Sequence, residues 1–362
     1  MRTIVLVKEN LIKSFHKTQL LLGFCFLIYF YACERQSPLV EFSGNSWGTT
    51  YTIKIVTEES SSFDFSRLKI GIDSIFISID NQMSTYKVNS EISLFNMLPK
   101  DGAMNISSGF VNVIQRSIYW SGITSGAFDI TVFPAVLNWR EGRKDREYKE
   151  IWAPPTDLDV IMEMEKIGYD KLNLNGNTLI KRIEGQMIDV NAIAKGWGVD
   201  QIFKYLEFKG FLSFMVEIGG EVRTIGKNNI GKNWRIGIDK PIEGQRPGES
   251  IYKVISLKNK SMATSGNYRD FYEYEGLQYS HIIDPTSGKT IQNNILSVTV
   301  TAPNCLDADV LATALNVMSF TQGLKLIESL KGYEALWIIK EDESFKSVAS
   351  SGMPISTYKR DN

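Results

Sequence analysis

Two oxygen-bearing side chains near the carboxyl end of the sequence are spaced for metal binding. Asp309 and Thr313 lie four residues apart in segment 307–314, whose pattern predicts the first turns of a helix. Residues four apart stack on one helix face, and a carboxylate and a hydroxyl are hard oxygen ligands of the kind Mg²⁺ takes. A second interpretation is structural: Asp307 caps the helix and Asp309 sits favourably in its first turn. This segment alone leaves both open.

Residues 189–200 could supply a second polar corner. Asp189 follows an expected strand through Met187 and Ile188, and Lys195 comes about one turn later, after a run containing small residues. A carboxylate at a strand end, with Gly/Ala turns and a lysine one turn on, fits a phosphate and metal corner. Earlier in the chain, Gly126 and Ala127 would let backbone approach a ligand closely; alternatively, they only end a helix and begin a turn.

Histidine and cysteine counts exclude other chemistries. His281 is the only histidine outside the leader described below, so a histidine-based zinc site is excluded. It opens segment 281–288, which runs from a strand end into a Pro/Gly turn. Cys25 and Cys33 belong to the leader and its end, leaving Cys305 alone, so no disulfide framework is expected.

Composition and motif searches exclude further classes. The net charge of -1, with no block of basic residues, gives no sign of a nucleic-acid partner. Segment 288–290 has the Gly-Lys-Thr tail of a phosphate-binding loop, but Ile283 stands where that motif needs glycine. No G-x-G-x-x-G fingerprint follows a strand either, so neither standard cradle holds a nucleotide here.

The first 32 residues predict an export signal. A basic start is followed by an apolar run over residues 20–32, too short for a comfortable membrane span, and then by Cys33. This arrangement resembles a bacterial lipoprotein signal, in which Cys33 would become the lipidated first residue. The alternative is a plain N-terminal anchor helix. Both place the rest of the chain outside the cytoplasmic membrane, lipid-anchored and facing the periplasm in the first case.

The expected elements give an α+β fold with a large, mostly antiparallel or mixed sheet and packed helices. We expect a tether over 33–45, one catalytic domain over 46–350 and a tail over 351–362. Apolar residues at helical spacing predict helices, and β-rich runs predict strands. Helices are expected at 64–83, 108–124 and 157–167, after residues 189–200 as far as about 209, and at 321–331. A hairpin is expected at 171–181, and strands at 47–56, 214–218, 234–239, 252–257, 296–301 and 335–340.

Five segments, taken in order, resemble the FAD:protein FMN transferase (ApbE-like) family, whose fold is related to the T-fold. They are 47–51 (WGTTY); 83–86 (MSTY) with 90–92 (SEI); 126–129 (GAFD) with Thr131; 189–196 (DVNAIAKG); and 281–285 (HIIDP) followed by Ala308, Asp309 and Thr313. Segments 219–221 (GGE) and 264–266 (TSG) also match. Their order and spacing cover nearly the whole mature chain.

The resemblance implies an Mg²⁺-dependent, periplasmic enzyme that splits FAD, joins FMN to a Thr or Ser hydroxyl of an acceptor protein and releases AMP. Such acceptors carry a Ser/Thr-Gly-Ala-Thr type motif and include flavin-bearing subunits of respiratory redox complexes. By position, the implied metal ligands are Asp309, Thr313 and the carbonyl of Ala192. The implied FAD contacts are Trp47, Tyr86, Ala127, Phe128, Asp129, Asp189, Lys195 and Ile283. Trp47 departs from the family, which usually has Met there.

The implied chemistry is attack of an alcohol on a pyrophosphate phosphorus. The main requirement is neutralisation of negative charge, which Mg²⁺ and Lys195 would meet. A hydroxyl also needs a base; His281 is the first candidate and Asp284 the second, although His281 could be structural and Asp284 could assist the metal. Two rival functions remain: an FAD pyrophosphatase that gives FMN and AMP with the same metal corner, and a non-catalytic flavin-binding lipoprotein, against which the metal spacing of Asp309 and Thr313 argues.

Overall fold

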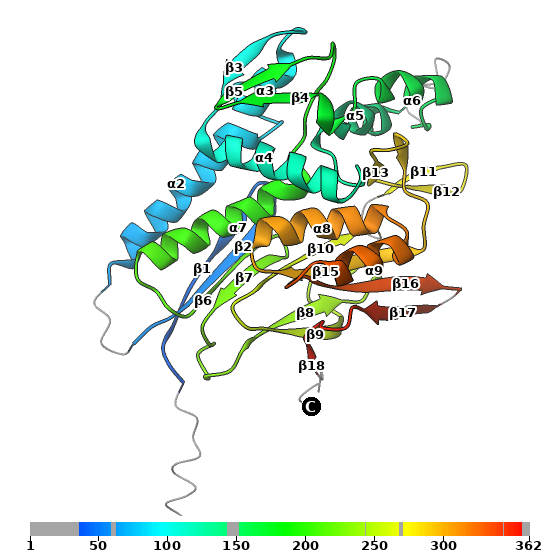
Figure 1. The fold of residues 1–362 in the computed structure, drawn as a ribbon. Helices are drawn as coiled ribbons and strands as arrows, with labels where there is room; N and C mark the ends of the chain where they lie inside the picture. Colours follow the sequence, from blue (N-terminus) through cyan, green and yellow to red (C-terminus); the bar gives the residue numbers. More distant parts are fainter. Residues whose placement is uncertain are drawn as a thin grey trace, which may run out of the picture.

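A computed structural model describes residues 36–58, 63–142, 152–242, 244–267, 271–342 and 344–356. An eight-stranded sheet forms its base, and all neighbouring strands in it are antiparallel. Figure 1 shows this sheet below the helices. Its strands, in spatial order, are β1 (Leu39–Ser46), β2 (Thr49–Val56), β6 (Phe214–Ile218), β7 (Glu221–Ile225), β10 (Ser261–Gly266), β15 (Ile295–Ala302), β16 (Glu334–Glu341) and β17 (Ser344–Ala349).

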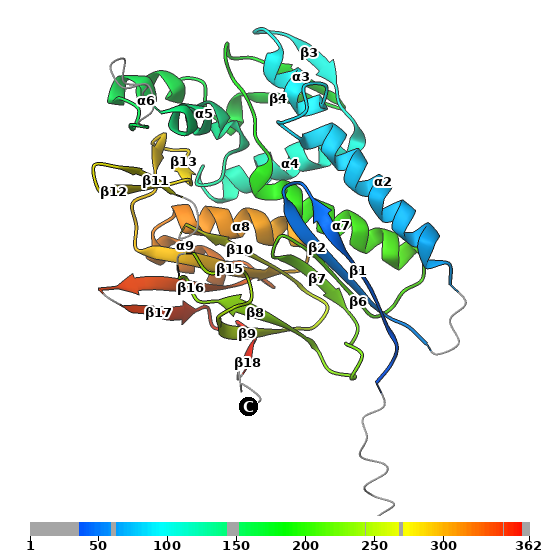
Figure 2. The same cartoon turned by 180° about the vertical axis from the view of Figure 1, so that it is seen from behind.

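Two long helices lie directly on the sheet. These are α7 (Asn191–Phe208) and α8 (Cys305–Val317), which contact each other and the central strands. A second layer, α2 (Phe65–Met83) and α4 (Ser108–Ile123), packs on them, as Figure 2 shows from behind. The helices α7 and α8 are therefore sandwiched, and most of their residues are buried.

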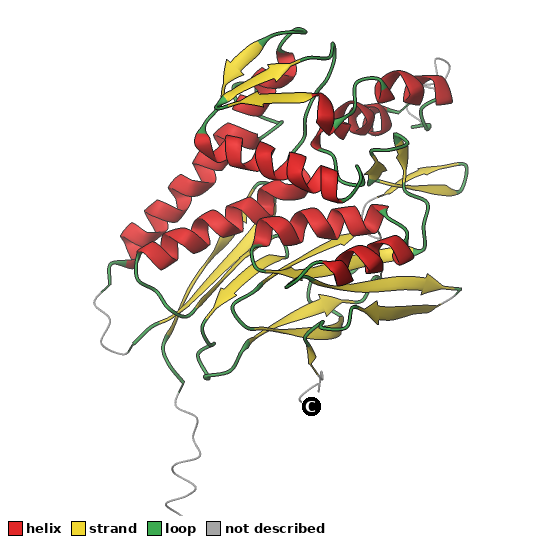
Figure 3. Cartoon of the chain, viewed as in Figure 1, coloured by secondary structure: helices red, strands yellow, loops and turns green. Residues whose placement is uncertain are grey.

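Smaller elements surround this frame (Figure 3). Helix α9 (Phe320–Ser329) packs beside β16, and β8 (Trp234–Asp239), β9 (Ile251–Leu257) and β18 (Ile355–Ser356) form a second sheet. A third sheet lies near α3 (Glu91–Met97) and comprises β3 (Ala103–Asn105), β5 (Thr178–Lys181) and β4 (Leu172–Asn175). The other elements are η1 (Ile130–Val132), α5 (Phe133–Glu141), α6 (Asp157–Met164), η2 (Tyr169–Lys171), β11 (Phe271–Tyr274), β12 (Leu277–Ser280), β13 (Ile283–Asp284) and β14 (Lys289–Thr290).

The α+β class with a large antiparallel sheet is confirmed, and each expected helix is present. Helix α7 begins at Asn191, however, earlier than the helix expected after residues 189–200. The tether expected over 33–45 is wrong for most of its length, because β1 pairs with β2 all the way from Leu39. The start of the expected strand 47–56 is also wrong: Trp47 and Gly48, with φ of 51° and 74°, form the two-residue turn between those strands.

Two further expectations fail for local reasons. Met187 and Ile188 form no ladder; instead the Asn96 side chain bonds both the N–H and the carbonyl of Ile188. The predicted tail contains β18, which pairs with β9. The predicted leader and Cys33 lie outside the described residues. Within the described residues, no helix is long and apolar enough to cross a bilayer.

The contact between α7 and α8 depends on a glycine. A Cβ on Gly196 would lie 2.5 Å from the carbonyl oxygen of Cys305 and 2.8 Å from Cα of Leu306. Those obstacles are backbone atoms, which cannot rotate away as the end of a flexible side chain can. Gly196 thus sets how closely the two helices approach.

We predict that Gly196→Ala lowers the free energy of unfolding by about 1–3 kcal/mol, because the added methyl overpacks the joint between α7 and α8. Urea unfolding measures this. Gly122→Ala in α4 is the matched control: an added Cβ there meets no atom within 4 Å, so the change should be neutral or stabilising by up to about 1 kcal/mol. Equal stability of Gly196→Ala and the wild type would refute the packing argument.

Candidate active site

The two predicted metal-binding segments meet where α7 and α8 cross. Asp309 is 5% exposed, and its Oδ2 accepts a hydrogen bond from the backbone N–H of Gly196 at 2.9 Å. In a regular helix that N–H would donate to the carbonyl of Ala192. The bond to Asp309 competes for this donor and so favours an Ala192 carbonyl available to a ligand. Thr313 is half-buried one turn further along α8.

This donor set fits Mg²⁺. It combines one carboxylate, from Asp309, with the neutral oxygens of Ala192 and Thr313, and Mg²⁺ commonly takes one or two carboxylates while keeping several waters. Within the described residues, no group of three or more His, Cys, Asp and Glu side chains could hold a metal. A cation at this crossing of α7 and α8 would therefore be bound by one carboxylate, one hydroxyl and one backbone carbonyl, rather than by a cluster of charged side chains.

An ion pair lies beside this crossing of α7 and α8 (the α7–α8 corner). Lys195 Nζ is 2.6 Å from Oε1 of Glu221, whose side chain is almost fully buried at the start of β7. Burial opposes the charge of Lys195, yet Glu221 and Asp309 outweigh it and raise the pKa of the lysine. Burial likewise raises the pKa of Glu221, against the effect of Lys195, and the charge of Asp309 adds to that rise. The charges of two carboxylates, one of them in contact, thus act on one ammonium, which favours binding of a further cation.

Glu221 was not among the predicted site residues. The available signal was the GGE turn after a buried strand, which matched the family pattern. What sequence spacing could not show is that this turn, 26 residues from Lys195, brings the glutamate to the lysine's ammonium.

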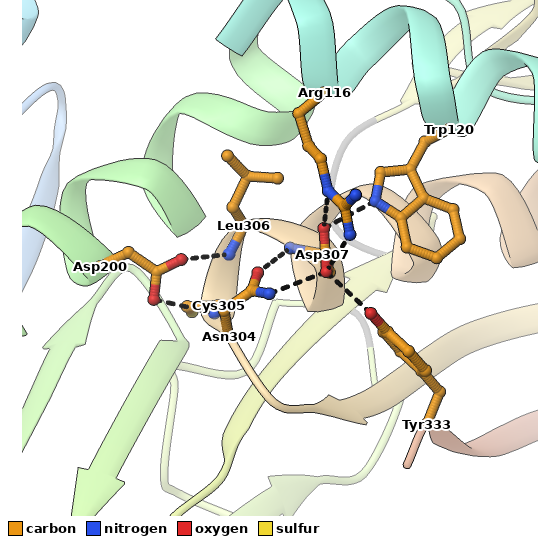
Figure 4. Close-up of polar contacts among 8 residues, drawn as sticks. All are labelled: Arg116, Trp120, Asp200, Asn304, Cys305, Leu306, Asp307 and Tyr333. Carbon is orange, nitrogen blue, oxygen red and sulfur yellow. Dashed lines mark hydrogen bonds and ion pairs between the residues drawn. The ribbon is translucent and has the colours of Figure 1, made fainter. Parts of the chain in front are cut away.

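The start of α8 is held from two sides (Figure 4). From α7, Asp200 accepts hydrogen bonds from the N–H groups of Cys305 and Leu306, both at 3.0 Å, and pairs with Arg223. A carboxylate at a helix N-terminus satisfies orphan donors and complements the helix dipole. These two bonds fix the first turn of α8 at positions four and three residues before Asp309.

Asp307 binds the other side of the same turn. It is not the N-cap of α8, as the structural interpretation of the sequence predicted. The cap is Asn304, which accepts from the N–H of Asp307. The Asp307 carboxylate accepts from Arg116, Trp120, Asn304 and Tyr333 at 2.6–2.8 Å. Burial would raise its pKa, but the bonds from Arg116 and Trp120 outweigh it and the pKa falls below its usual value.

Asp189 lies just before α7 and is half-buried. Its carboxylate accepts from the N–H of Asn191 at 2.6 Å, and burial raises its pKa despite that bond and the charge of Arg140. Its own N–H donates to the carbonyl of Ile130 at 2.8 Å. This bond joins the α7 corner to the turn that contains Ala127.

In that turn, Ala127, Phe128 and Asp129 are all buried. Asp129 Oδ1 accepts from the N–H and hydroxyl of Thr131, and Oδ2 accepts from the N–H of Tyr169. Both carboxylate oxygens of Asp129 therefore bond within the fold and hold this turn in place.

The remaining predicted contacts lie in different surroundings. The ring of Trp47 lies over Gly198, because a Cβ added to Gly198 would lie 2.6 Å from this ring. The same ring packs edge-on against Phe76. Ile283 belongs to an apolar cluster with Trp139. Tyr86 is 81% exposed, so the structure does not bring it into the same buried cluster as Asp309.

His281 and Asp284 follow the β11–β12 hairpin. Asp284 Oδ1 accepts from the N–H and hydroxyl of Thr286, and Oδ2 accepts from the hydroxyl of Ser287, so this carboxylate holds the turn. His281 is exposed. A Cβ on Gly126 would lie 3.5 Å from the methyl of Thr286, which places this turn beside the one containing Ala127.

Comparisons with known proteins identify the family of this chain. The ApbE family profile matches residues 47–337. The FAD:protein FMN transferase of Vibrio cholerae is 39% identical, over 90% of this chain and 95% of that protein, and the one of Haemophilus influenzae is 36% identical, over 88% and 92%. The solved flavin transferase ApbE from Vibrio cholerae superposes with a TM-score of 0.77 at 39% identity, covering 87% of this chain and 98% of that one. The apo flavinyl transferase ApbE of Pseudomonas stutzeri gives 0.76 at 30% identity, over 87% and 96%. The chain therefore belongs to the ApbE family.

Proposed function

We propose that this chain is an FAD:protein FMN transferase. It cleaves FAD and attaches FMN through a phosphoester bond to a Thr or Ser of an acceptor protein, releasing AMP. Curated relatives at 39% and 36% identity carry that name over most of their length. The structural observation that carries the proposal is the corner of α7 and α8, where the buried Asp309 carboxylate bonds the N–H of Gly196, next to the half-buried side chain of Lys195.

The transfer breaks one bond and forms one bond at phosphorus. The acceptor hydroxyl attacks the FMN phosphorus, the pyrophosphate P–O bond to AMP breaks, and the hydroxyl proton passes to a base. Negative charge accumulates on the phosphate oxygens, and Lys195 supplies a fixed positive charge beside them. Asp309, Thr313 and the carbonyl of Ala192 would hold Mg²⁺, which when bound neutralises and aligns the pyrophosphate.

His281 is the proposed base. We favour it over Asp284, because the Asp284 carboxylate accepts bonds from Thr286 and Ser287 and so holds its own turn. His281 precedes that turn and is exposed, as a group that takes a proton from an incoming protein segment must be.

The acceptor and the address are proposals that rest on the sequence. A Ser/Thr-Gly-Ala-Thr type motif, such as that of flavin-bearing subunits of respiratory redox complexes, would supply the hydroxyl. The leader and Cys33 support a lipid anchor and a place in the periplasm. The membrane would then be a second partner, reached through the lipid.

The function is tested by mixing the protein with FAD, Mg²⁺ and an acceptor bearing such a motif, followed by intact mass measurement of the acceptor. The mass of the acceptor should rise by one FMN phosphoryl unit. An acceptor that lacks the Ser or Thr hydroxyl should show no rise. Free FMN and AMP with unmodified acceptor would instead identify a pyrophosphatase. Bound, uncleaved FAD would leave a flavin-binding protein.

We predict that Asp309→Asn lowers the transfer rate by at least about 100-fold, because it removes the only charged ligand of the proposed cation. The residual rate should require a higher Mg²⁺ concentration. Rates over a Mg²⁺ titration, with circular dichroism to check the fold, measure this. Asp73→Asn on the surface of α2 is the control and should behave as wild type. An unchanged Mg²⁺ dependence in Asp309→Asn would remove the metal assignment.

We predict that His281→Gln lowers kcat by about 10²–10⁴-fold, the usual contribution of a general base, while FAD still binds. Asp284→Asn should instead mainly reduce stability, because it weakens the bonds to Thr286 and Ser287. Steady-state rates and thermal unfolding of both variants separate these effects. A large loss of kcat in Asp284→Asn, with His281→Gln fully active, would reverse the assignment.

A further inference from the structure

The Lys195–Glu221 pair is built asymmetrically. Glu221 is 1% exposed, and its Oε1 binds Lys195 at 2.6 Å. Its Oε2 is buried and accepts no hydrogen bond from any residue that the structure describes. A buried carboxylate with one bare oxygen is unfavourable for stability. Such a group is more readily explained by what it does for Lys195 than by a contribution to folding.

The turn before Glu221 is shaped to reach the lysine. Gly219 and Gly220 have φ of 59° and 98°, values that favour glycine. A Cβ on Gly219 would lie 2.9 Å from the Thr49 hydroxyl and 3.4 Å from Cδ of Lys195. The turn therefore passes close to the lysine stem, and β7 starts at Glu221 with its side chain directed to the ammonium.

A lysine needs such a partner to act at a defined point. Its side chain is long and flexible, and its ammonium is a point charge with three rotatable donors. One donor is bound by Glu221 Oε1, which leaves two for phosphate oxygens. Asp309 adds a second negative charge near the same ammonium, so the lysine stays protonated at the corner.

We propose that Glu221 is a positioning residue, which holds the ammonium of Lys195 where it meets the pyrophosphate of FAD. This inference rests on the proposed function of Lys195. Glu221 itself touches neither substrate nor metal in this account, and acts only through the lysine. Loss of Glu221 should therefore slow the chemical step more than it weakens FAD binding, because removing a negative charge does not reduce attraction of an anion.

The test is a double-mutant cycle on the full-length protein with Glu221→Gln, Lys195→Met and the double variant, measuring kcat and KM for FAD in acceptor flavinylation. Glu221→Gln should lower kcat by about 10–100-fold, the scale of an ångström-level misplacement, with KM unchanged or lower. In the Lys195→Met background, Glu221→Gln should have no further effect. Glu221→Asp, which keeps the charge, should recover part of kcat.

Glu217→Gln is the matched control. Glu217 lies at the same turn, and its carboxylate bonds the N–H of Gly220 rather than the ammonium of Lys195. It should leave kcat near the wild-type value. An equal loss of kcat in Glu217→Gln, a rise in KM alone, or additive losses in the double variant would overturn the positioning role.

A second readout does not depend on transfer. Competitive acetylation of Lys195, followed by peptide mass spectrometry, should proceed faster in Glu221→Gln than in wild type, because the lysine loses its partner. Equal acetylation would overturn the proposal even if transfer were slowed. If the wild type transferred no FMN, the proposed function would fail, and the acetylation result would still decide whether Glu221 holds Lys195.

Discussion

The close approach of α7 to α8 is the constraint on which the site depends. At Gly196 the absence of a side chain lets the backbone of α7 come against Cys305 and Leu306. Only at that distance can the Gly196 N–H reach Asp309 and the Asp200 carboxylate reach the first turn of α8. One contact therefore fixes a carboxylate, sets up competition for the Gly196 N–H that would otherwise bond the Ala192 carbonyl, and aligns both helices on the sheet.

Buried charge around this joint is arranged for position more than for stability. Asp200 and Asp307 each receive several hydrogen bonds, and each has an arginine partner. Buried ion pairs contribute little net stability, since desolvation offsets their attraction. Their geometric effect is large, however, because they fix the start of α8. Asp309 and Glu221 differ from them: the charges of both act on the ammonium of Lys195. This excess of negative charge suits a divalent cation, while the ammonium suits a phosphate substrate.

Much of this arrangement could be predicted from the sequence, where local patterns carry the information. Helical spacing from Leu68 to Met83 predicts α2, and the spacing of Asp309 and Thr313 correctly places them on one helix. Edge strand β1 was missed because its alternation is weak and half its residues are exposed. The role of Asp307 was also missed, because its partners Arg116 and Tyr333 lie 191 and 26 residues away. Long-range contacts of this kind leave no local signature. Glu221 illustrates the same limit, since its turn was recognised and its partner was not.

The central claim is that α7 and α8 together build a cation site from Asp309, Thr313 and the carbonyl of Ala192. The most direct measurement is a crystal structure of the protein grown with Mn²⁺ in place of Mg²⁺, located by its anomalous scattering. We predict a peak within bonding distance of all three oxygens. A peak bound elsewhere, or none at this corner at saturating Mn²⁺, would contradict the account.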